Sequence, residues 1–148
     1  MSERLVQLST PGEPISLGKT GREFKGLDAI KLRNKPKEGE RKATLRKVDF
    51  TTNELTAFCP VTRQPDIYSV VIEVDPIEHS IETKSLKLYF ESFRESAIYA
   101  EDVAVKIATD IFEACKPYFV SVKVTQNIRG GIQLMAEAVL SSDFEEAF

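Results

Sequence analysis

A stripe of apolar residues at helical spacing, followed at once by an alternating strand pattern, constrains the fold of this chain more than any other feature. One side of the predicted helix carries Ala104, Ile107, Ala108, Ile111 and Cys115. Glu101 and Asp102 place negative charge in its first turn, and Lys116-Pro117 ends it. The strand that follows alternates polar residues with Val120, Val122 and Val124. Each element has one apolar side to bury, which favours helices packed on one face of a sheet.

The remaining elements complete an α+β layout. Alternating or β-branched patterns predict three further strands, over residues 45–52, 68–74 and 132–140. Asp75-Pro76 ends the second of these, and Gly130-Gly131 makes the turn before the last. Apolar residues at helical spacing predict another helix from about Ser85 to about Arg94. The order strand, strand, helix, helix, strand, strand predicts an antiparallel sheet with two helices on one face.

Length and composition limit the class of protein. The 148 residues suit one domain, which we place over residues 45–148, after a polar arm or set of loops over 1–44 that is dotted with glycine and proline. The formal charge of −3 argues against a dedicated nucleic-acid binder. There is no apolar run of membrane-spanning length and no signal pattern, and two cysteines suit a reducing compartment, so we expect a cytoplasmic protein. One histidine and two cysteines argue against a zinc site, and we expect no metal.

A polar loop carries a candidate nucleophile and a candidate acid. In Cys59-Pro60-Val61-Thr62-Arg63-Gln64-Pro65-Asp66, a loop cysteine near a cation can have a depressed pKa and attack an electrophilic carbon. A buried, inert thiol is the alternative. Asp66, at the entrance of a strand, could donate a proton or could be a solvated turn residue. Cys115 lies on the apolar helix stripe, where packing is the expected role.

A second segment, Glu82-Thr83-Lys84-Ser85-Leu86-Lys87-Leu88-Tyr89, mixes charged and hydroxyl groups with apolar residues. This pattern is typical of a segment that buries one side and presents charge from the other. Its lysines could be plain surface charges, and Glu82, like Glu101, could simply favour a helix dipole. Arg129-Gly130-Gly131 could grip a phosphate, because glycine lets a backbone approach a ligand closely. Gly18-Lys19-Thr20 is not a phosphate-binding loop, since Glu13 stands where that motif needs glycine.

Together these segments resemble the NADPH-dependent 7-cyano-7-deazaguanine reductases, the QueF nitrile reductases of queuosine biosynthesis, in their single-module form. Residues 82–89 match the family signature, with Thr83 where serine or leucine is usual, and residues 59–66 match the catalytic loop. Ser92-Phe93-Arg94, Glu101-Asp102 and then Arg129-Gly130-Gly131-Ile132 follow in the family's order. Leu17-Gly18 and Gly21 resemble its N-terminal segment.

The resemblance implies a tunnelling fold (T-fold) that assembles into homo-oligomeric rings, usually two stacked rings of five, with active sites between subunits. It implies a small-molecule substrate, with no membrane and no direct nucleic-acid partner. The Cys59 thiolate would form a covalent thioimide with the nitrile, Asp66 would protonate the nitrogen, and two NADPH molecules would supply hydride. The resemblance assigns substrate binding to Ile81, Glu82, Thr83, Ala100 and Glu101. It assigns cofactor binding to Lys84, Ser85, Lys87, Arg129 and Gly130.

One departure from the family pattern keeps two alternatives open. The family usually has a histidine before the substrate glutamate, and this chain has Ala100 there. Tyr99 or His79 could stand in for that imidazole. The alternatives are an archaeosine-type amidinotransferase acting on 7-cyano-7-deazaguanine in transfer RNA, which shares the cysteine chemistry but lacks the NADPH signature, and a non-catalytic base-binding ring. A zinc-dependent cyclohydrolase of the same fold fails for lack of ligands.

Overall fold

The computed structural model describes residues 26–33 and 37–142. The glycine-containing segment that resembles the family's N-terminal region and most of the acidic tail lie outside the described residues.

A four-stranded antiparallel sheet forms the body of the structure. Its strands are β2 (Val48–Phe58), β3 (Pro65–Asp75), β5 (Phe119–Arg129) and β6 (Ile132–Ser141), in the order β2-β3-β5-β6. The predicted strands are confirmed, although the first was placed over residues 45–52 and lies further along. A register shift between Thr52 and Leu55 explains the error, because the bulge moves the inward-facing residues from even to odd positions and hides the alternation.

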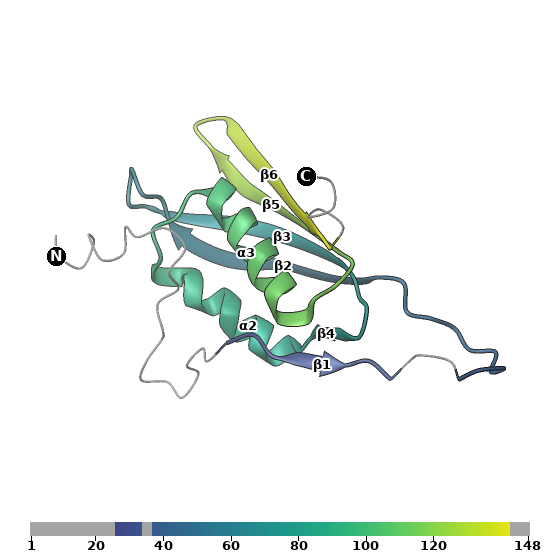
Figure 1. Ribbon diagram of the computed structural model, residues 1–148. Helices are drawn as coiled ribbons and strands as arrows, with labels where there is room; N and C mark the ends of the chain where they lie inside the picture. The colour runs from purple at the N-terminus through teal and green to yellow at the C-terminus, as the bar shows by residue number, and fades with distance from the viewer. Residues whose placement is uncertain (1–25, 34–36, 143–148) are drawn as a thin grey trace.

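The two helices pack on one face of this sheet, as expected for the α+β class (Figure 1). They are α2 (Thr83–Glu91) and α3 (Ala100–Cys115), and a 3-10 turn, η1 (Ser92–Glu95), replaces the last turn predicted for the first helix. Two three-residue strands, β1 (Ala29–Lys31) and β4 (His79–Ile81), pair separately from the main sheet. Neither was predicted, because three residues are too few to show a periodic pattern.

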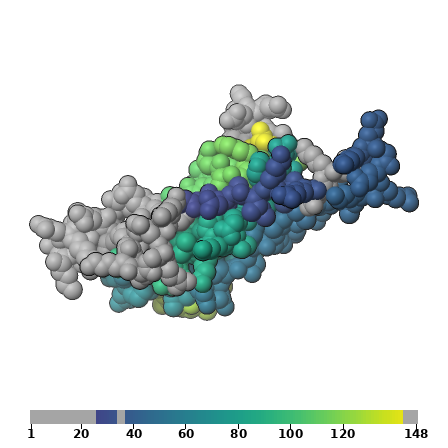
Figure 2. Space-filling model, turned by 90° about the horizontal axis from the view of Figure 1, so that it is seen from below, coloured from purple at the N-terminus to yellow at the C-terminus, as the bar shows by residue number. Residues whose placement is uncertain are grey.

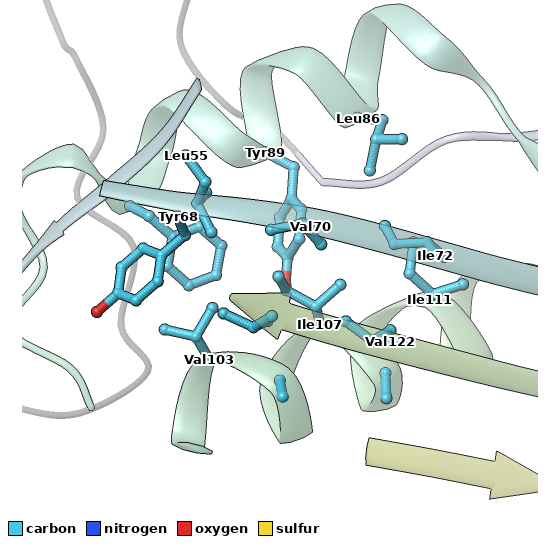
Figure 3. Packing of buried hydrophobic residues seen from close by; sticks show 14 of the residues in the cluster. Leu55, Tyr68, Val70, Ile72, Leu86, Tyr89, Val103, Ile107, Ile111 and Val122 are labelled. Atoms are coloured by element: carbon cyan, nitrogen blue, oxygen red, sulfur yellow. The ribbon is translucent and has the colours of Figure 1, made fainter. Parts of the chain in front are cut away.

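The core lies between the sheet and the helices (Figure 3). Alternate residues of β3 and β5 face the helical stripe that the sequence predicted, and all of these side chains are buried. The largest side chains that are fully buried include Tyr68, Tyr89, Phe93, Leu55, Ile72, Ile107 and Ile111.

Residues before the main sheet are joined to the start of α2. Figure 2 shows residues 26–33, in purple, lying across the teal surface of this region. The backbone carbonyl of Asp28 accepts from the N–H of Glu82 at 2.8 Å, and the Asp28 N–H donates to the Ser85 hydroxyl at 2.9 Å. These bonds fix β1 against the N-terminus of α2.

Tyr89 joins the two helices across the core. Its ring meets Phe93 edge to face, with centroids 5.2 Å apart, and its hydroxyl donates to Asp110 of α3 at 2.6 Å. Lys106 completes this group, with its ammonium 3.1 Å from the same carboxylate oxygen. Burial, and then the charge of Asp110, raise the pKa of Tyr89, so the phenol stays protonated and donates.

Replacing Tyr89 by phenylalanine should lower the free energy of unfolding by about 1 to 2 kcal/mol, since a hydrogen bond to a partly buried carboxylate is lost while the ring stays. Urea denaturation followed by circular dichroism measures this loss. Tyr118→Phe is the matched control, because that tyrosine is exposed, and its change should stay within about 0.5 kcal/mol. Equal effects of the two substitutions would contradict the assigned role of the Tyr89 hydroxyl.

Candidate active site

The loop that connects β2 to β3 holds the candidate nucleophile. It is closed by two backbone bonds, from the N–H of Cys59 to the carbonyl of Gln64 at 2.9 Å and from the N–H of Arg63 to the carbonyl of Cys59 at 2.8 Å. Arg63 takes a left-handed conformation with φ 59° to make this tight turn. The polar loop predicted around Cys59 is therefore present.

The thiol of Cys59 is half-buried and accepts a long hydrogen bond from the N–H of Thr62, at 3.5 Å. Burial alone raises the pKa of Cys59, but hydrogen bonds from Thr62 and Val61 outweigh it and bring the pKa below its usual value. The charge of Asp66 acts in the opposite direction. A lowered thiol pKa increases the thiolate fraction at neutral pH, which is the form that attacks carbon.

Asp66 lies near the start of β3, as predicted, and is only 4% exposed. One of its oxygens pairs with Nη1 of Arg129, and the other accepts a long hydrogen bond from the Tyr68 hydroxyl, at 3.4 Å. Burial, followed by the charge of Asp66, raises the pKa of Tyr68, so this phenol can only donate to the carboxylate. Burial of a carboxylate requires such partners.

Arg129 connects the carboxylate to the catalytic loop. Its Nη2 donates to the Thr62 hydroxyl at 3.2 Å and to the side-chain carbonyl of Gln64 at 3.3 Å. Arg129 is the last residue of β5, and Gly130 and Gly131 follow with φ 60° and 78° in the turn to β6. The structure thus brings four predicted residues to one end of the sheet: Cys59, Asp66, Arg129 and Gly130.

The N-terminus of α3 lies at this same end. Phe58, which precedes Cys59, pairs with Ala97 through bonds of 2.8 Å to the Ser96 carbonyl and 3.0 Å from the Ile98 N–H. Ala100 begins α3 three residues later and is buried in the core, whereas Glu101 in the first turn is exposed.

The remaining residues that the sequence assigned to substrate or cofactor lie toward the start of α2. This is the end of the helix that lies away from Cys59. Glu82 caps this helix, and its carboxylate accepts from the N–H groups of Lys84 at 2.8 Å and Ser85 at 2.7 Å. These two bonds, Lys84 first, lower the pKa of Glu82. The Ser85 hydroxyl is buried and bonded to Asp28 and to the Glu82 carbonyl, whereas Thr83, Lys84 and Lys87 are exposed. Ile81 is buried at the end of β4. Since nine helical residues span about 13 Å, α2 separates this group from the end that carries Cys59.

A groove of about 390 Å³ runs between β2 and α2. Its apolar surface comes from Phe50, Leu86 and Phe90, and Thr83, Lys87 and Arg94 stand beside it. Within the described residues, no ion pair engages Lys84, Lys87 or Arg94. The lining also includes three carboxylates, those of Asp49, Glu54 and Glu91, together with Thr51 and Thr52. Neither Cys59 nor Asp66 lines the groove. The groove therefore combines two aromatic rings with two cations, Lys87 and Arg94, and with three carboxylates.

The sequence did not assign roles to Thr62, Gln64, Tyr68 or Arg94. Thr62 and Gln64 belong to the loop that matches the family's catalytic motif. That match was the signal that could have assigned them a role in the site. Tyr68 read only as a strand residue, because its contact with Asp66 depends on both side chains lying on the same face of β3.

Within residues 26–33 and 37–142, no helix has the length and apolar character needed to cross a membrane. The same part of the chain contains no cluster of three or more histidine, cysteine or carboxylate side chains placed to hold a metal ion.

Comparison with known proteins identifies related chains. A family model described as QueF-like protein matches residues 65–143. A protein of Syntrophus aciditrophicus named NADPH-dependent 7-cyano-7-deazaguanine reductase is 37% identical over 134 residues, which cover 90% of this chain and 93% of that protein. A protein of the same name from Frankia casuarinae is 41% identical over 95 residues, covering 64% of this chain and 76% of that protein.

One solved structure shows the same fold. The crystal structure of the archaeosine synthase QueF-Like in the apo form superposes with a TM-score of 0.62, covers 66% of this chain and 95% of that one, and is 23% identical. At that identity the likeness concerns the fold alone, and it agrees with the tunnelling fold expected from the sequence.

Proposed function

The chain belongs to the QueF-like protein family, and from that premise we propose that it is an NADPH-dependent oxidoreductase that reduces the nitrile of 7-cyano-7-deazaguanine to an aminomethyl group, a step of queuosine biosynthesis. The observation that carries the proposal is that Cys59 and Asp66 lie at the same end of the sheet. Hydrogen bonds of the loop lower the pKa of the Cys59 thiol, and the Asp66 carboxylate is buried. A thiolate nucleophile needs a reducing compartment, which supports the cytoplasm as the location.

The first step is addition of sulfur to the nitrile carbon. Cys59 gives its proton to the ionised Asp66, and the thiolate then attacks the carbon, forming a C–S bond while one π bond of the nitrile breaks. The electron pair of that bond moves to nitrogen, which takes the proton from Asp66. The product is a covalent thioimide, and the proton count balances. The Asp66 carboxylate, paired with Arg129, would be the proton acceptor and then the proton donor of this step.

The groove between β2 and α2 supports the assignment of the cofactor to the start of α2. NADPH supplies hydride when bound, and reduction of a nitrile to a primary amine takes four electrons, so two cofactor molecules are needed. Lys87, which lines the groove, and Lys84, which lies in the first turn of the same helix, would bind phosphates, and Phe50 or Phe90 would stack on a base. Ser85, whose hydroxyl is engaged with Asp28, would contribute by fixing the helix start. Arg129 and Gly130, at the other end of α2, would contact the cofactor only across a subunit boundary.

Substituting Lys87 by alanine should raise the KM for NADPH about tenfold, because one charge-assisted phosphate contact is removed, and should leave the formation of the thioimide unchanged. Initial rates at varied NADPH, together with adduct formation by intact mass, measure the two effects. Lys116→Ala is the matched control, since Lys116 is exposed at the end of α3 and pairs with the exposed Glu113. A KM equal to that of the unmodified protein would remove Lys87 from the cofactor site.

Assembly into rings would complete the site. Glu101 would hold the guanine-like edge of the substrate, with Ala100 beside it, while Ile81, Glu82 and Thr83 lie at the far end of α2 and would reach the substrate from a neighbouring subunit. β2 and β6 are the outer strands of the main sheet, and long outer strands can pair with another chain.

Two stacked rings of five would have a mass about ten times the 16.6 kDa of one chain. Light scattering on the purified protein measures that mass, and the activity per chain should fall on dilution below the concentration at which the rings dissociate. A fully active monomer would contradict the assignment of the site to two subunits.

The reaction itself is tested with 7-cyano-7-deazaguanine and NADPH, by following the loss of NADPH absorbance. We expect two equivalents of NADPH oxidised per nitrile, and no oxidation with Cys59→Ala. Cys115→Ala is the matched control, because this thiol is buried, bonded to the Ile111 carbonyl and has a pKa raised by burial to about 11. A Cys59 adduct that forms without NADPH oxidation would favour the amidinotransferase, and the absence of any adduct would favour the base-binding ring.

A further inference from the structure

Tyr68 places a phenol hydroxyl beside Asp66 in the core. The residue is fully buried, and its hydroxyl donates to Oδ2 of Asp66 at 3.4 Å. The two residues are two positions apart on β3, so their side chains lie on the same face of the strand. Figure 3 shows Tyr68 at the edge of the labelled cluster, with its hydroxyl pointing away from Val70 and Tyr89. The ring therefore belongs to the core, while its oxygen belongs to the candidate site.

This hydroxyl is not needed for packing. The residues that follow Tyr68 on the same face of β3 are aliphatic and buried, namely Val70, Ile72 and Val74. Phenylalanine would fill the space of the Tyr68 ring, and a buried hydroxyl costs free energy unless it is hydrogen-bonded. The oxygen therefore indicates a role at Asp66, the residue that it contacts.

The two oxygens of Asp66 have different partners. Nη1 of Arg129 pairs with Oδ1, and Tyr68 donates to Oδ2. These partners come from β5 and β3, so they hold the carboxylate from two strands and limit its rotation. A guanidinium is cationic and only donates, which disfavours a proton on Oδ1, whereas a phenol hydroxyl both donates and accepts. Oδ2 is therefore the oxygen better suited to take up a proton.

We infer that Tyr68 is a positioning residue that orients Asp66 and makes Oδ2 the oxygen that carries the proton from the thiol to the nitrile nitrogen. The inference rests on the proposed function and deepens it. The proton leaves Sγ of Cys59, is held on Oδ2 and passes to the nitrogen, so Asp66 returns to its starting form. Tyr68 keeps its own proton throughout, in agreement with the burial that raises the pKa of this phenol.

The test measures how fast Cys59 forms an adduct with 7-cyano-7-deazaguanine in the absence of NADPH, by intact mass at varied nitrile concentration. Tyr68→Phe keeps the ring and removes the hydroxyl. It should lower the rate at saturating nitrile roughly threefold to tenfold, as expected for the loss of one long hydrogen bond to a charged group. The nitrile concentration that gives half the maximal rate should change by less than about twofold, because the buried Tyr68 lies behind Asp66 and does not bind the substrate.

Tyr89→Phe is the matched control, because it removes another buried phenol hydroxyl that donates to a carboxylate, that of Asp110, at 2.6 Å. The bond of Tyr89 is the shorter of the two, so a general loss of stability would slow adduct formation at least as much in this variant. We expect its rate to equal that of the unmodified protein. Equal slowing of the two variants would overturn the inference.

A second comparison asks whether Tyr68 acts through Asp66. In an Asp66→Ala background, which removes both carboxylate oxygens, Tyr68→Phe should change the remaining rate by less than about twofold. The same slowing in both backgrounds would overturn the inference. Thermal melting by circular dichroism checks the fold of each variant. Tyr68→Met, which also lacks the hydroxyl but fills the site with a flexible side chain, takes the place of Tyr68→Phe if that variant does not fold.

Failure of the inference and failure of the proposed function give different results. A Tyr68→Phe variant that forms the adduct as fast as the unmodified protein would overturn the inference and leave the proposed function standing. An unmodified protein that forms no adduct would refute the proposed reaction and, with it, the role of Tyr68. Because the adduct forms before any hydride is transferred, the comparison does not depend on whether NADPH is then oxidised.

Discussion

The ion pair between Arg129 and Asp66 is the interaction on which the candidate site depends. The Arg129 guanidinium makes further contacts beyond this pair. It reaches from the end of β5 to Asp66 on β3 and to Thr62 and Gln64 on the loop. A carboxylate as buried as that of Asp66 is costly without a cation, on the order of several kcal/mol, so its position requires this arginine. A register shift lies between Gln126 and Arg129, so an irregularity of the ladder directly precedes the arginine, as is often found near functional sites.

The sequence predicted the main elements because their apolar patterns are long and regular, as in α3 and β5. It missed the extent of β2, where a bulge after Thr52 reverses the pattern. It also missed the partner of Arg129. That residue lies 63 positions from Asp66, and the two meet because the register of β3 with β5 places Tyr68 opposite Gln126. Such a pairing follows from the alignment of two strands, which no local pattern reveals.

The predicted site residues form two groups, one at each end of α2. Glu82 and Ser85 are largely engaged in building the start of that helix, through the cap and the contact with Asp28. The lysines beside them, Lys84 and Lys87, are exposed. The family signature therefore has two physical components, one that fixes the backbone and one that presents charge. This division places Glu82 and Ser85 at the end of α2 that lies away from Cys59, so the proposed function depends on a neighbouring subunit to bring the two groups together.

The two cysteines show how the environment selects the reactive thiol. Cys115 lies on the buried face of α3, where burial raises its pKa to about 11 and its proton is donated to the Ile111 carbonyl. Cys59 is also partly buried, yet donors on its loop more than offset that effect. A helix cannot offer such donors in its middle, because its N–H groups are already bonded to carbonyls. A tight turn leaves N–H groups free to point at one sulfur, which suits the position of the candidate nucleophile in a closed loop.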